Sequence, residues 1–146
     1  MQRLFESSES LNRGRHISLL DYCAAATAGW AALETTSAIL VFVIPHGPNF
    51  APEIGPAATF VAFSLVYTIG YLALFAILAV PMRLLVVKVE SAIAKKLLPL
   101  ASGAVFALVS GTFEWLDSSA RNAYSVATLF AVAGVVCMIV MQIAAK

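Results

Sequence analysis

The stretch Ser18–Pro45 reads SLLDYCAAATAGWAALETTSAILVFVIP, and it indicates what kind of molecule this chain is. A helix needs about 20 mostly apolar residues to cross the hydrocarbon core of a bilayer, which is about 30 Å thick. This stretch is long enough, and it carries Glu34 near its middle. An unpaired carboxylate at that depth is costly, so we expect Glu34 to have a partner or a function. The stretch therefore predicts a membrane-spanning helix organised around one acid.

The composition of the whole chain agrees with a membrane environment. Of its 146 residues, 61% are hydrophobic and 12% are charged, whereas a soluble domain has about 45–50% and about 25%. A soluble core of this size would not bury so much apolar surface. The net charge of +1 gives no basic field for nucleic acid, so that class of partner is excluded and the lipid bilayer is expected instead.

Three further apolar stretches follow the first one. We predict membrane spans at about residues 18–44, 57–82, 97–116 and 123–145. The expected fold is therefore an all-α integral membrane protein, a compact bundle of four transmembrane helices. Because no soluble domain or repeat is left over, residues 1–146 form one predicted domain.

Residues 82–96, between the second and third spans, are amphipathic. Two helical faces alternate there, one with Lys88, Ser91 and Lys95 and the other with Leu85, Val89 and Ile93. This pattern is typical of a helix that lies at a membrane surface. We therefore predict a short cytoplasmic amphipathic segment that continues the second span, and we expect Pro99 in the first turn of the third span, where proline is tolerated.

Basic residues are distributed unequally between the two sides of the predicted bundle. Four spans place both termini on one side, and that side holds eight of the nine basic residues: Arg3, Arg13, Arg15, Arg83, Lys88, Lys95, Lys96 and Lys146. Only Arg121 lies on the other side. Cytoplasmic loops carry such an excess of Lys and Arg. We therefore expect cytoplasmic termini, in the inner membrane of a bacterium.

The second span offers partners for Glu34. Ser64, Tyr67, Thr68 and Tyr71 recur at helical spacing, and they lie at the depth of Glu34. We predict that these residues form an intramembrane polar cluster, with the two tyrosine hydroxyls beside the acid. Two interpretations remain open, because the cluster would either join two helices or exchange a proton or bind an ion during transport.

Small residues recur every four positions in the last two spans. The two stripes are Gly103, Ala107 and Gly111 in the third span and Ala123, Ala127 and Ala131 in the fourth. Such stripes let helices approach closely in lipid. They indicate packing within the chain or contact with a second copy or another protein, and two stripes on neighbouring helices favour packing within the chain for one of them.

The sequence gives little sign of chemistry. His16 and His46 lie at opposite ends of the first span, so they cannot bind one metal ion or haem iron together within one chain. Cys23 and Cys137 both lie in apolar stretches, where cysteine usually behaves as a small apolar residue. We therefore expect no enzyme activity, no catalytic residue, no metal and no cofactor.

Two functional hypotheses follow. The first is a small non-enzymatic membrane protein that acts through self-assembly, as a homo-oligomer, or as a subunit of a membrane complex. The alternative is a small transporter or channel whose pathway uses Glu34 with Tyr67 and Tyr71. The stripes of small residues favour the first hypothesis, and the intramembrane acid favours the second.

Overall fold

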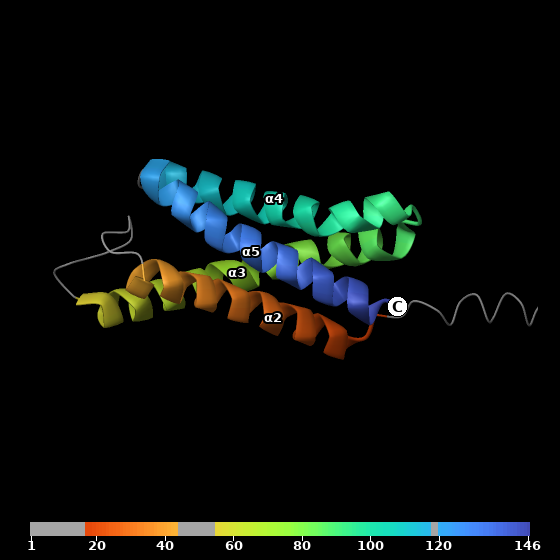
Figure 1. Cartoon of the computed structure of the whole chain (residues 1–146), viewed down its shortest axis with the longest axis horizontal. Coiled ribbons are helices and arrows are strands. Elements are labelled where there is room, and N and C mark those ends of the chain that lie inside the picture. Colours follow the sequence, from red (N-terminus) through yellow and green to blue (C-terminus); the bar gives the residue numbers. More distant parts are fainter. Residues whose placement is uncertain (1–16, 44–54, 118–119) are drawn as a thin grey trace, which may run out of the picture.

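The computed structural model describes residues 17–43, 55–117 and 120–146. In these residues the chain forms α2 (Leu19–Ala38), a short π-helical turn η1 (Ile39–Val43), α3 (Gly55–Lys88), α4 (Ala92–Asp117) and α5 (Ala120–Ala144). The four long helices pack as a bundle (Figure 1). Each contains a stretch long and apolar enough to cross a membrane, at Leu19–Val43, Gly55–Lys88, Ala92–Leu116 and Ala123–Ala144. The predicted all-helical bundle of four such helices is confirmed.

Helix α2 begins where the sequence supplies an N-cap residue. Ser18 is the N-cap of α2, and its Oγ accepts a hydrogen bond from the backbone N–H of Asp21 at 3.3 Å. The Asp21 carboxylate accepts in return from the Ser18 N–H at 2.7 Å. This reciprocal capping box satisfies two backbone donors that have no partner within the helix. It fixes the start of α2.

Successive helices run in opposite directions (Figure 1). The start of α2, the end of α3, the start of α4 and the end of α5 therefore lie at one end of the bundle, which we call the basic end. Its described basic residues are Arg83, Lys88, Lys95, Lys96 and Lys146. Arg3, Arg13 and Arg15 were predicted for the same side and lie outside the described residues.

The amphipathic segment at residues 82–96 is divided between two helices. Helix α3 continues through Pro81 to Lys88, and α4 already begins at Ala92. The Ser91 Oγ accepts from the Ala94 N–H at 3.5 Å, which caps α4 before its apolar stretch begins. The expected start of this helix at about Leu97 is corrected, and Pro99 lies in the interior of α4.

The core of the bundle lies around α5. This helix has its most extensive contacts with α4 and then with α2, whereas α3 touches its neighbours less closely. The largest fully buried side chains are Leu33, Tyr71, Phe106, Leu129, Met138 and Met141. Large apolar side chains such as Leu65 and Ile69 remain exposed on the outside. Apolar outer surfaces of this kind indicate contact with a lipid bilayer.

Candidate functional site

Glu34 on α2 bonds directly to two hydroxyl groups of α3. The Ser64 Oγ donates to one carboxylate oxygen of Glu34 at 2.7 Å, and the Thr68 Oγ1 donates to the other at 2.9 Å. The Thr68 hydroxyl also accepts from the indole N–H of Trp30 at 3.0 Å. We call Trp30, Glu34, Ser64 and Thr68 the Glu34 cluster. It joins two helices by three hydrogen bonds between side chains.

The Glu34 cluster is only partly covered within one chain. Glu34, Ser64 and Thr68 are half-buried, and 41% of the Trp30 surface is exposed. Glu34 lies one helical turn before the end of α2 but nine residues before the end of the apolar stretch Leu19–Val43, and both helices are apolar enough to cross a membrane. Lipid chains cannot donate or accept hydrogen bonds, so polar groups on such a surface need protein neighbours.

The two tyrosines of the predicted cluster lie elsewhere. The Tyr71 hydroxyl donates to the backbone oxygen of Ala26 at 3.0 Å, so the prediction that it binds Glu34 is wrong. The Tyr67 ring is stacked on Phe63 at 5.4 Å between ring centroids, and it meets the edge of Phe130 at 6.3 Å. Of the five predicted cluster residues, the structure brings Glu34, Ser64 and Thr68 together.

Helix geometry explains this division. Residues four apart lie on nearly the same row of a helix, so Ser64 and Thr68 form one row and Tyr67 and Tyr71 form another, about 60° away around the axis. The serine–threonine row of α3 contacts Glu34 on α2. The tyrosine row lies inside the bundle, where the Tyr71 ring is 6.1 Å from the Phe106 ring of α4.

Gly29 of α2 has a packing role that was not predicted from the sequence. A Cβ atom added there would lie 2.9 Å from Cζ of Tyr71 and 3.1 Å from the backbone oxygen of Ala133. Glycine therefore makes room for the Tyr71 hydroxyl between α2 and α5. Its signal was present, because Gly29 is the single glycine between Ser18 and Ile44. Trp30 carried a signal too, since it lies one helical turn before Glu34.

The two stripes of small residues face each other within the chain. A Cβ atom at Gly103 of α4 would lie 2.9 Å from the backbone oxygen of Ala131 on α5. One at Gly111 would lie 3.1 Å from Cβ of Ala127 and 3.5 Å from the backbone oxygen of Ala123. Ala107 lies between the two glycines on the same row of α4. These stripes therefore account for the close packing of α4 on α5.

Tyr67 lines an apolar cavity between α3, α4 and α5. The cavity has a volume of about 560 Å³, and Ser110 and Glu114 are its other polar side chains. Glu34 is not among the residues that line it. Within residues 17–43, 55–117 and 120–146, no group of three His, Cys, Asp or Glu is placed to hold a metal ion. His16 and His46 lie outside these ranges.

Comparisons of this chain with known protein families, with curated proteins and with solved structures gave no match.

Proposed function

We propose that this chain is a non-enzymatic membrane subunit that assembles with a second copy of itself through the face of α2 and α3 that carries the Glu34 cluster. The observation that supports this proposal is the half-buried carboxylate of Glu34, which lies in the middle of a membrane-spanning helix. The small-residue stripes do not support it, because they pack against each other within the chain.

The cost of an exposed acid in lipid favours assembly. Ser64 and Thr68 supply one hydroxyl donor to each carboxylate oxygen, but all three side chains remain half-buried. A helix of a second subunit would shield these groups from lipid, which offers no hydrogen bonds. The exposed Trp30 ring beside them supplies the large apolar contact area that is typical of interface centres.

A cysteine of the chain provides a cross-linking site on this face. Cys23 is exposed, and at about 100° per residue it lies on nearly the same row of α2 as Trp30 and Glu34. Cys137 of α5 is buried and serves as the matched control. We expect a bifunctional maleimide to cross-link two copies in native membranes through Cys23. Cys23→Ser should abolish the cross-link, and Cys137→Ser should leave it unchanged.

The same experiment tests the role of the acid. In the Cys137→Ser background, Glu34→Ala should reduce cross-linking through Cys23, because the hydroxyl donors lose their acceptor and the face loses its shape. A Cys23 that reacts fully with a monofunctional maleimide but gives no cross-linked dimer in native membranes would contradict assembly through this face. Cross-linking to a different protein would place the face in a hetero-complex.

Transport is the alternative function, and the convergence of oxygen atoms from Glu34, Ser64 and Thr68 favours it. Glu34→Gln keeps the size of the side chain and its ability to bond the hydroxyls, but replaces the carboxyl group with an uncharged amide. If Glu34 carries ions or protons, this variant should lose flux in proteoliposomes while it still forms cross-linked dimers. If the cluster only joins helices, flux and assembly should both match the wild type.

We further propose that the basic end faces the cytoplasm of a bacterial cell. Its five described basic residues support this orientation, since Lys and Arg are retained on the cytoplasmic side of inner-membrane proteins.

A further inference from the structure

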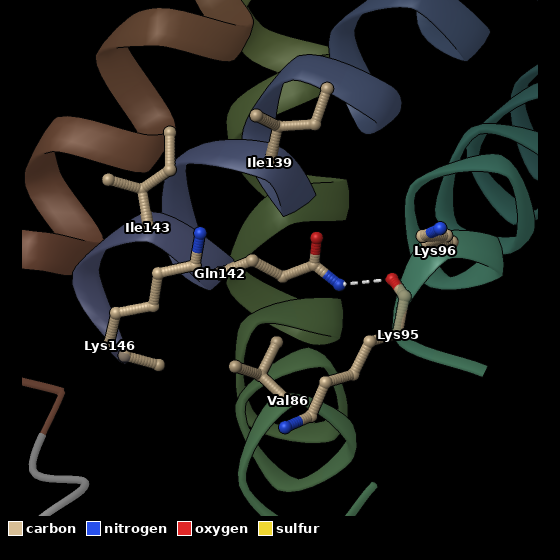
Figure 2. Close-up of a pocket in the computed structure, with 8 residues that line it drawn as sticks. Val86, Lys95, Lys96, Ile139, Gln142, Ile143 and Lys146 are labelled. Carbon is tan, nitrogen blue, oxygen red and sulfur yellow. Dashed lines mark hydrogen bonds between the residues drawn. The ribbon is translucent and has the colours of Figure 1, made fainter. Parts of the chain in front are cut away.

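A second cavity lies at the basic end, between the last turns of α3 and α5 and the first turns of α4. Its volume is about 610 Å³. Lys95 and Lys96 of α4 and Lys146 after α5 line it, together with Gln142 (Figure 2). None of the described residues that line it is acidic. Three lysines from two segments thus line one space, and no acidic side chain is among its described lining residues.

A hydrogen bond between two lining residues connects α4 to α5 beside this cavity, and a proline explains why it forms. Lys95 lies four residues before Pro99, and proline has no N–H to donate to the Lys95 carbonyl in the usual helical pattern. The side chain of Gln142 replaces that donor, because its Nε2 bonds the Lys95 backbone oxygen at 2.6 Å (Figure 2). This bond fixes the first turns of α4 against α5. It also leaves the Lys95 side chain pointing toward Val86 of α3 (Figure 2).

The position of the cavity suggests its ligand. The apolar stretch of α4 begins close to it, at Ala92, and that of α5 ends close to it, at Ala144. The cavity therefore lies at the level of lipid head groups. Its wall also includes Ile139 and Ile143, whose exposed fractions are 41% and 62%. Cationic groups above an exposed apolar wall match a molecule with an anionic head and acyl chains. Basic pockets between transmembrane helices bind anionic lipid head groups in this way.

We propose that this cavity binds the phosphate group of an anionic phospholipid, with Lys95 and Lys146 as its principal contacts and the acyl chains against Ile139 and Ile143. This site is separate from the Glu34 cluster and does not depend on assembly through that cluster. The shared chemistry of the ligand is a phosphate oxyanion, and the acyl chains distinguish a lipid from free phosphate.

The test uses the full chain in dodecyl maltoside with added phosphatidylglycerol, phosphatidylcholine or inorganic phosphate. Native mass spectrometry measures bound lipid. We expect phosphatidylglycerol to bind at least about tenfold more tightly than phosphatidylcholine, because only the former carries net negative charge. A large excess of inorganic phosphate should leave most of the phosphatidylglycerol bound, since it has no acyl chains.

Matched variants separate a built site from general charge. Lys95→Gln with Lys146→Gln should weaken phosphatidylglycerol binding about 10- to 30-fold. Arg83→Gln with Lys88→Gln removes the same charge from the same end outside the cavity, and should change binding less than about threefold. The double variant Lys95→Arg with Lys146→Arg keeps both charges, and it should bind phosphatidylglycerol as the wild type does. Equal loss in both glutamine pairs, no preference between the two lipids, or full displacement by inorganic phosphate would overturn the proposal.

Discussion

At the scale of single residues, Thr68 links Glu34 to Trp30, because its hydroxyl donates to the carboxylate and accepts from the indole N–H. Thr68→Val keeps the shape of the side chain but removes both bonds. We expect it to lower the free energy of unfolding by about 1–2 kcal/mol, the upper range for hydrogen bonds between membrane helices. Thr35→Val is the control, since the Thr35 hydroxyl bonds only the Ala31 backbone oxygen of its own helix. Equal losses in both variants, measured by unfolding in mixed micelles, would contradict a special role for Thr68.

Gly29 gives a second prediction at this scale. Gly29→Ala should destabilise the bundle by about 1–3 kcal/mol, because the new methyl group overlaps the Tyr71 side chain and approaches the Ala133 backbone oxygen. Gly70→Ala is the matched control, since its Cβ would meet only Cζ of Phe130, at an ordinary 3.6 Å. The midpoint of thermal unfolding in detergent should fall for Gly29→Ala and hold for Gly70→Ala. A reversed order would show that α2 does not depend on this close approach.

The sequence was informative about Glu34 and less so about its donors. An acid in the middle of an apolar stretch needs partners, and the predicted polar stripe of α3 includes Ser64 and Thr68, which donate to Glu34. The hydroxyls of Tyr67 and Tyr71 were expected beside the acid, because the spacing of the tyrosines also fits one side of a helix. Spacing alone could not separate two rows about 60° apart, since the choice depends on how α3 is rotated against α2 and α5.

At the scale of elements, Pro99 and Gln142 form a pair that connects α4 and α5. Gln142→Leu removes the donor to the Lys95 backbone oxygen, so we expect a loss of about 1–2 kcal/mol of unfolding free energy. Pro99→Ala restores a backbone N–H that can bond the same oxygen within α4. In the Pro99→Ala background, Gln142→Leu should therefore cost much less.

The four proteins of this double-mutant cycle are compared by thermal unfolding in the same detergent. Additive effects would contradict the coupling, because they would mean that Gln142 does not replace the donor that Pro99 lacks. The sequence did not suggest this pair. Gln142 appeared as one polar residue near the end of an apolar span, and Pro99 was expected in the first turn, where its missing N–H leaves no carbonyl unsatisfied.

At the scale of the whole molecule, hydropathy was sufficient to predict the four helices. Each predicted span overlaps one helix that is apolar enough to cross a membrane. The start of α4 was placed too late because Lys95 and Lys96 interrupt the apolar stretch, whereas the backbone follows the cap at Ser91. The sequence also could not show that the two small-residue stripes pack against each other, since that depends on which helices are neighbours in the bundle.

The orientation of the bundle in the membrane follows from the distribution of its charges. The basic end carries the described residues Arg83, Lys88, Lys95, Lys96 and Lys146. Keeping these residues in the cytoplasm avoids moving their charges across the membrane. An alkaline phosphatase fused after residue 90 should therefore be inactive in bacterial cells. The same enzyme fused after residue 50, between η1 and α3, should be exported and active.

A fluorescent protein that folds only in the cytoplasm provides the control, because its signal should show the opposite pattern at the same two positions. Activity of the phosphatase after residue 90, with none after residue 50, would reverse the orientation. In that case the cavity of Lys95 and Lys146 would face the other leaflet. Its proposed phosphatidylglycerol would then have to come from that leaflet, while the lysine contacts themselves would stay the same.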